Sequence, residues 1–205
     1  ACADSDDGSS GDALVPEQAI KNARMAAREA GGYTVLMLGH NLVLPQWGGI
    51  DGASTVEVAS DRGVARATLV RTGEPDATYA VVLVDGETFF KRSTCNDWFR
   101  IPGGGSDVLA PFFLETSLLE AADGYVFRAP DPGGGLVIEA RLADLGEVAI
   151  VVDPSDWRVG GILSNDPERD DGAVFDLLLR DWGEEPEVAR PSGAIQDRGP
   201  GGIPC

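Results

Sequence analysis

The stretch TYAVVLVDGETFFKR, residues 78–92, decides the fold more than any other part of the sequence. Two runs rich in β-branched and aromatic residues flank Asp85-Gly86, a dipeptide that favours a two-residue turn between antiparallel strands. The stretch therefore predicts a β-hairpin. Because its strands are long and its turn is short, we expect its neighbours to continue as a meander rather than as alternating strands and helices.

Further strand-like runs lie on both sides of this hairpin, separated by short turn signals. The runs are YTVLMLGHNLVL (33–44), STVEVAS (54–60), VARATLVRT (64–72), NDWFRI (96–101), YVFRA (125–129), GLVIEARL (135–142), EVAIVVD (147–153), WRVGGIL (157–163) and AVFDLLLRDW (173–182). In the last run the alternation places Phe175, Leu177 and Leu179 on one face, and Asp176, Arg180 and Trp182 on the other.

Two segments have helical spacing. The first begins near Pro16, has an alanine-rich stripe, and ends at Gly31-Gly32. The second is APFFLETSLLEAADG (110–124), in which Pro111 would open a helix and Gly124 would end it. About ten strands are too many for two short helices to cover flatly. We therefore expect an α+β fold: a strongly curved antiparallel sheet, a half-barrel, wrapped around two or more helices and enclosing a hydrophobic cavity.

The composition narrows the classes of function. The chain has 205 residues, 43% of them hydrophobic, and a net charge of -18. A surface this acidic disfavours nucleic-acid binding and purely electrostatic docking on anionic lipids. The chain lacks a GxSxG motif and a supported Cys–His pair, and NDPERDDG (165–172) lacks the EF-hand order. The glycine triplets at 103–105 and 133–135 fit flexible loops. We expect no enzyme activity, no metal and no cofactor.

Three cysteines are present: Cys2, Cys95 and Cys205. Cys95 lies in an expected hairpin tip, so we expect it to be exposed and able to pair with Cys205 if the C-terminal tail folds back. That disulfide would close a loop of about 100 residues and stabilise the fold by about 4–5 kcal/mol in the chain-entropy view. Free thiols, or a Cys2–Cys205 pair, are the alternatives. A Cys95–Cys205 disulfide would leave Cys2 without a disulfide partner and would imply that the protein resides in an oxidising compartment.

The order of several motifs resembles that of the mycobacterial LppX/LprG lipoprotein family. The motifs are YAVVLVDGETFFKRSTCNDWFRI, DVLAPFFLETSLLEAADG, EVAIVVDPSDWRVGGIL and AVFDLLLRDWGEEPEV, and the resemblance spans residues 14–190. The resemblance implies an exported actinobacterial lipoprotein, anchored through an N-terminal cysteine on the outer face of the cytoplasmic membrane. It also implies a cavity that takes acyl chains of a lipid or lipoglycan, which the protein carries across the periplasmic space.

From this resemblance and the apolar patterning we predict a set of residues that line a lipid cavity. They are Val35, Met37, Val58, Leu69, Val81, Leu83, Phe89, Phe112, Phe113, Leu118, Phe127, Phe175 and Leu177. The same residues would also form an ordinary closed core. The alternative function is therefore a non-enzymatic envelope sensor or protein-interaction module.

The expected organisation has three parts. Residues 1–13 would be a flexible tether behind Cys2, whose diacylation would supply the two chains that stable anchoring needs. Residues 14–190 would form a single lipid-binding domain, and residues 191–205 a tail pinned by the disulfide. We expect a monomer whose partners are its lipid ligand and the membrane.

Overall fold

A computed structural model describes residues 14–44, 48–52, 54–101, 108–143, 145–164 and 174–197. Several features singled out in the sequence lie outside these ranges: the tether with Cys2, the glycines 103–105, the acidic stretch 165–172, and Cys205. Within the described residues, no helix combines the length and the apolar character needed to cross a bilayer.

The expected hairpin at 78–92 is confirmed. Strand β5 (Thr78–Val84) pairs antiparallel with β6 (Glu87–Arg92). The two residues of the turn, Asp85 and Gly86, have φ angles of 54° and 71°. Both lie in the left-handed region that this tight turn requires, which is why the sequence has Asp-Gly there.

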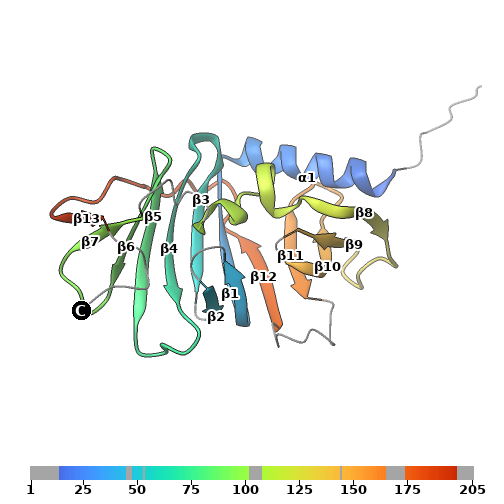
Figure 1. Cartoon of the computed structure of the whole chain (residues 1–205). Helices are drawn as coiled ribbons and strands as arrows, with labels where there is room; N and C mark the ends of the chain where they lie inside the picture. Colours follow the sequence, from blue (N-terminus) through green and yellow to red (C-terminus); the bar gives the residue numbers. More distant parts are fainter. Residues whose placement is uncertain are drawn as a thin grey trace, which may run out of the picture.

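The described strands form one sheet, antiparallel except at one edge (Figure 1). Its order is β13-β7-β6-β5-β4-β3-β1-β12-β11-β10-β9-β8, with β2 paired to β1. The other strands are β1 (Gly32–Leu44), β2 (Gly48–Asp51), β3 (Thr55–Ala59), β4 (Val64–Val70), β7 (Trp98–Arg100), β8 (Ala121–Phe127), β9 (Leu136–Leu142), β10 (Gly146–Val152), β11 (Val159–Ser164), β12 (Val174–Arg180) and β13 (Ile195–Asp197).

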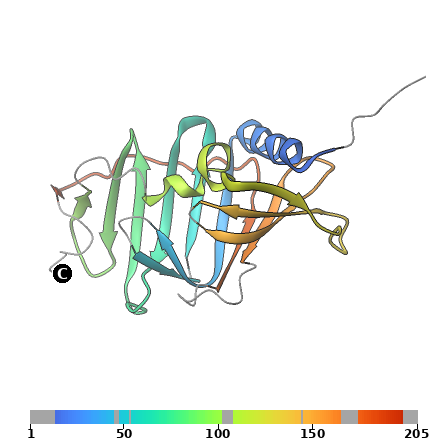
Figure 2. The same ribbon diagram turned by 45° about the vertical axis from the view of Figure 1, so that its right-hand side comes forward.

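The sheet is twisted and open. The strands β9 and β10 run nearly crosswise to β4 and β5 in Figure 2. In the described part of the chain β8 and β13 are the two edges and do not pair with each other, so the sheet does not close into a barrel. The large antiparallel sheet of the expected fold is therefore present.

The first helix, α1 (Pro16–Ala30), lies across one end of the strands (Figure 1). Its buried side chains are small or short, namely Ala19, Ile20, Ala23 and Ala27. The hydroxyl of Ser60, in the 3₁₀ turn η1 (Ser60–Arg62), donates a hydrogen bond of 3.0 Å to the Ala27 carbonyl oxygen and ties the helix to the β3–β4 connection. The alanine stripe thus lets the helix approach the sheet closely.

The prediction of a second helix at residues 110–124 is wrong. Residues 110–124 form a 3₁₀ turn η3 (Ala110–Phe112), a π-helical turn η4 (Leu114–Leu118), and then the start of β8. The hydroxyl of Tyr33 in β1 explains the break, because it donates to the Phe112 carbonyl oxygen (3.0 Å) and accepts from the Leu114 N–H (2.8 Å). Gly124, expected to end a helix, lies inside β8 at an irregular register.

The C-terminal segment joins the sheet, although the sequence showed no pattern there. Strand β13 pairs parallel with β7, and the Asp197 carboxylate accepts hydrogen bonds of 2.7 and 3.0 Å from the Arg100 guanidinium. Upstream of β7, Cys95 is only 4% exposed and belongs to the hydrophobic core, so the expectation of an exposed cysteine is wrong.

Candidate functional site

The predicted lining residues fall into three groups. Eleven of the thirteen belong to one buried cluster: Val35, Met37, Val58, Leu69, Val81, Leu83, Phe112, Phe113, Leu118, Phe175 and Leu177. Phe127 is partly buried against that cluster. Phe89 is the exception, because it packs with Ala59, Val64 and Val84 in a second cluster. Alternation along β6 turns Phe89 away from Phe90, which joins the first cluster, so we remove Phe89 from the lining set.

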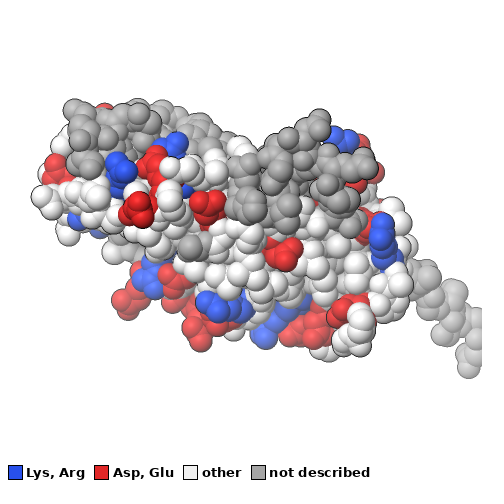
Figure 3. Space-filling view, turned by 90° about the horizontal axis from the view of Figure 1, so that it is seen from below, with Lys and Arg blue, Asp and Glu red and all other residues white. Residues whose placement is uncertain are grey.

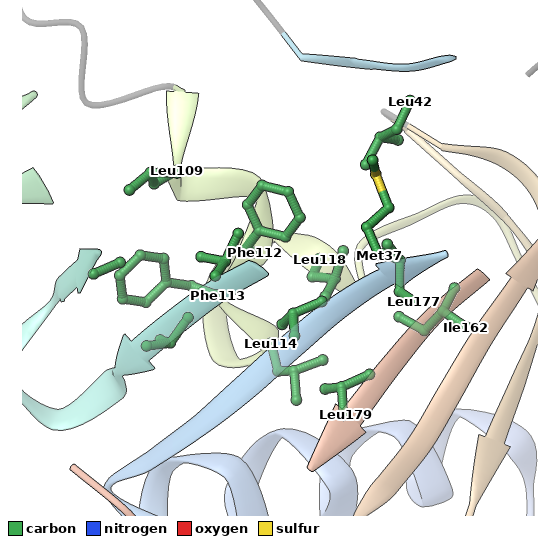
Figure 4. Close-up of a cluster of buried hydrophobic side chains, with 14 of the residues drawn as sticks. Met37, Leu42, Leu109, Phe112, Phe113, Leu114, Leu118, Ile162, Leu177 and Leu179 are labelled. Carbon is green, nitrogen blue, oxygen red and sulfur yellow. The ribbon is translucent and has the colours of Figure 1, made fainter. Parts of the chain in front are cut away.

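The interior that these residues form is packed. None of the eleven exposes more than 5% of its surface. A side chain that lines an empty chamber would present surface to that chamber, so these values leave no room for a large enclosed void between the side chains of this cluster. Figure 4 shows what fills the space: Phe112, Leu114 and Leu118, from η3 and η4, lie over Met37 of β1 and Leu177 and Leu179 of β12. The expected enclosed cavity is not seen along these side chains.

Open space lies instead in a groove beside α1, with a volume of about 760 Å³. This volume is within the range of small-molecule sites. The groove is bounded by α1, by the β3–β4 and β5–β6 connections, by η3–η4, and by β8. Its lining residues are Glu17, Ile20, Lys21, Arg24, Met25, Arg28, Ser60, Gly63, Leu83, Gly86, Ala110, Phe113, Glu115, Thr116 and Tyr125. Of the predicted set, only Leu83 and Phe113 reach it.

The groove combines apolar and cationic side chains. Ile20, Leu83 and Phe113 belong to the core and reach the groove with 5% or less of their surface exposed. Met25 is 50% exposed, a large exposure for an apolar side chain beside a hollow. The cationic groups are Lys21, Arg24 and Arg28. The sequence of α1 indicates its buried alanine stripe but holds no local signal that Lys21, Arg24 and Arg28 line a groove.

Hydrogen bonds hold the wall of the groove in place. The Arg24 guanidinium donates to the carbonyl oxygens of Glu115 (3.2 Å) and Thr116 (3.1 Å), and so links α1 to η4. On the far wall, the Tyr125 hydroxyl accepts from the Ala121 N–H (3.1 Å) and donates to the Leu119 carbonyl oxygen. These bonds satisfy backbone groups that the irregular turns would otherwise leave without partners.

Glu115 lies between the groove and the interior. Burial raises the pKa of its carboxyl group above the ordinary value, and hydrogen bonding and the nearby arginines oppose that rise. Its Oε2 atom is buried without a hydrogen-bond partner. Burial also raises the pKa of Tyr33 well above its ordinary value, so its hydroxyl stays neutral and can bridge β1 and η4. Among the described residues, no group of three or more His, Cys, Asp or Glu side chains is placed to hold a metal ion.

Comparison with known proteins gives structural matches only. No family model and no curated protein match the sequence. The lipoprotein LppX of Mycobacterium tuberculosis matches with a TM-score of 0.55 at 13% identity, over 83% of this chain and 96% of that chain. LprF of Mycobacterium bovis matches with a TM-score of 0.52 at 16% identity, over 87% and 99%. An uncharacterized conserved protein of Thermus thermophilus gives 0.51 at 10% identity, over 89% and 98%.

These matches confirm the resemblance at the level of the fold. Both LppX and LprF are mycobacterial lipoproteins of the LppX/LprG family, and the chain shares their architecture over most of its length. At such low identities the comparison shows the fold alone, because one fold can carry unrelated functions.

Proposed function

We propose that the protein is a non-enzymatic, lipid-binding protein of the cell envelope, which holds acyl chains of a lipid or lipoglycan in the groove beside α1. The observation that carries this proposal is the groove itself, with its volume of about 760 Å³ and its apolar side chains Ile20, Met25, Leu83 and Phe113. Each buried methylene contributes about 0.8 kcal/mol, so about ten of them supply about 8 kcal/mol. Binding of this kind needs no reactive side chain.

The wider role that we propose is that of an exported carrier. Diacylated Cys2 would anchor the chain to the outer face of the cytoplasmic membrane, residues 1–13 would tether residues 14–190, and the loaded protein would carry its lipid across the periplasmic space. The shared fold with two mycobacterial lipoproteins supports this proposal. Mass spectrometry of the protein made in an actinobacterial host tests the anchor, because an unmodified Cys2 there would contradict it.

We also propose the Cys95–Cys205 disulfide. Its support is the pairing of β13 with β7, which brings Asp197 beside Arg100, near Cys95 in the chain. The segment from Asp197 to Cys205 can span about 27 Å when extended. A peptide map under non-reducing conditions should contain a Cys95–Cys205 species; a Cys2–Cys205 species would contradict the pairing.

A groove-filling substitution tests lipid binding. Met25→Trp places a bulky ring in the groove, whereas Gln18→Trp places the same ring on an exposed part of α1. We expect wild type and Gln18→Trp to bind fluorescently labelled palmitic acid, and Met25→Trp to bind it at least tenfold more weakly. Native mass spectrometry of protein from an actinobacterial host should show a co-purified lipid. If wild type neither co-purifies with lipid nor binds the probe, the proposal fails.

A second candidate is an envelope sensor or protein-interaction module. The observation that favours it is the packed interior, in which the eleven clustered lining candidates expose 5% of their surface or less. This candidate predicts equal probe binding, or none, for all three proteins in the experiment above, because the groove would then have no ligand.

A further inference from the structure

The cationic side chains of the groove form one stripe on α1. Lys21, Arg24 and Arg28 follow one another at spacings of three and four residues, which places them on one face of a helix. All three line the groove, beside the apolar Ile20 and Met25 of the same helix. One element thus presents positive charge and apolar surface to the same hollow.

This stripe differs from the charge pattern elsewhere in a chain of net charge -18. Many arginines lie beside carboxylates; Arg66 and Glu57, for example, are 2.5 Å apart, and Arg190 and Glu87 are also paired. Figure 3 views the end of the molecule opposite α1 and shows basic side chains next to acidic ones. By contrast, Lys21 and Arg28 form no ion pair with a carboxylate of the described residues.

The carboxylates of the groove do not cancel this charge. Glu17 and Glu115 also line it, so three cations face two carboxylates. Burial disfavours the charged form of Glu115, which weakens its compensation of the cations. Arg24 already donates to two backbone carbonyl oxygens, which leaves the exposed Lys21 and Arg28 as the groups most available to an anion.

We propose that the groove selects a lipid with an anionic phosphate headgroup, whose phosphate contacts Lys21 and Arg28 while its acyl chains lie along Met25, beside the core residues Leu83 and Phe113. This inference rests on the proposed lipid-binding function and names its ligand class. Charge complementarity inside an apolar hollow is the argument for it, since a carrier of neutral lipids has no use for unpaired cations there. A membrane surface is a poorer occupant, because the acidic chain as a whole is repelled by anionic bilayers.

Calorimetric titration with short-chain lipids tests the selection without a membrane surface. The probes are dihexanoyl phosphatidylglycerol and dihexanoyl phosphatidylcholine, both kept below their micelle concentrations, with glycerol phosphate as the headgroup without chains. We expect wild type to bind the phosphatidylglycerol about tenfold more tightly than the phosphatidylcholine. Glycerol phosphate should not bind in the same concentration range, and added salt should reduce the preference.

Two double variants with the same change in net charge locate the effect. In Lys21→Gln/Arg28→Gln the preference should fall to less than twofold, with binding of phosphatidylcholine retained. Lys91→Gln/Arg141→Gln alters cations outside the groove and should keep the wild-type preference. Lys21 and Arg28 are exposed, and circular dichroism should confirm that both variants fold as wild type.

The outcomes separate this inference from the function on which it rests. Equal binding of the two lipids by wild type overturns the headgroup selection and leaves lipid binding intact. Binding of neither lipid refutes lipid binding in the groove and the selection with it. Two further results also overturn the selection: glycerol phosphate that binds as tightly as the lipid, or a preference that appears only with phosphatidylglycerol vesicles, which would indicate surface docking.

Discussion

The interior beneath η3–η4 and the groove beside α1 share a boundary, formed by Ile20, Leu83 and Phe113, which contribute to both. The interior is filled by side chains from both sides, whereas the groove is open and carries charge. The apolar side chains on the two sides of this boundary are of similar types, and only the groove adds charged ones. The difference teaches that hydrophobic pattern decides which way a side chain faces, while the path of one irregular segment decides whether space remains in front of it.

The largest expected effect comes from the interior. Leu114 is fully buried, and Leu114→Ala should lower the free energy of unfolding by about 3 kcal/mol, because it removes buried methylenes and leaves a cavity. Urea unfolding measures this value. If the interior were a ligand chamber instead of a core, the variant would lose less than about 1 kcal/mol and bind labelled palmitic acid more tightly.

The bridge between β1 and η4 should have a smaller effect. Tyr33→Phe keeps the ring but leaves the Phe112 carbonyl and the Leu114 N–H without their partner. Leaving a buried donor or acceptor without its partner costs about 1–3 kcal/mol, so we expect the free energy of unfolding measured in urea to fall by about 2 kcal/mol. Faster hydrogen exchange should be confined to residues 110–118; uniform exchange across the sheet would show that Tyr33 does not hold this segment.

Shortening a side chain that lines the groove should leave the stability of the fold nearly unchanged. Met25 is half exposed, so Met25→Ala should change the free energy of unfolding by less than about 0.5 kcal/mol. Binding of labelled palmitic acid should weaken severalfold in the same variant. A loss of stability as large as that of Leu114→Ala would mean that the groove and the interior are one packed unit.

The smallest effect concerns pH at the boundary. Burial raises the pKa of the Glu115 carboxyl group above its ordinary value of 4.5, so the folded protein holds this proton more tightly than the unfolded chain does. The stability that the bound proton contributes is fully present below that ordinary value and is lost as the pH rises through the higher, folded-state pKa. Glu115→Gln imitates the protonated form. Its Tm should therefore exceed that of wild type slightly at about pH 7, and the difference should vanish towards about pH 4.5.

An exposed carboxylate supplies the control for this measurement. Glu147→Gln makes the same change in net charge on the surface of β10. Its effect on Tm should not follow the pH dependence of Glu115→Gln. Identical curves for the two variants would assign the change to overall charge rather than to the burial of Glu115.

The sequence allowed the sheet to be predicted because its signals are local. Asp85-Gly86 specifies a turn, and alternation placed Phe175, Leu177 and Leu179 on the buried face, as the structure has them. The same alternation gave a wrong prediction just beyond the end of β12. Trp182, expected on the outer face, packs against the core and lies 5.0 Å from the Tyr33 ring, because Asp181 takes a φ of 55° and reverses the chain direction.

The site was harder to predict because it depends on contacts between distant segments. Residues 110–124 have helical spacing, yet Tyr33 and Arg24 take up backbone groups that a helix would use, and Ala121 pairs with Leu142 of β9. No local pattern contains these partners. The groove exists because these contacts between distant segments prevent the helix that the local spacing predicts. For that reason only Leu83 and Phe113 of the predicted lining residues reach it.

The parallel strand β13 has a consequence for solubility. Without it, β7 would offer a free row of backbone N–H and C=O groups, the kind of edge along which sheets of separate molecules join. The ladder from Ile195 to Asp197 occupies that row, and the Arg100–Asp197 pair secures it. Its two strands are 97 residues apart in the chain, so a nascent polypeptide exposes the β7 edge until residue 197 has been made. Protection of this edge against self-association thus arrives only after the other described strands of the sheet have been made.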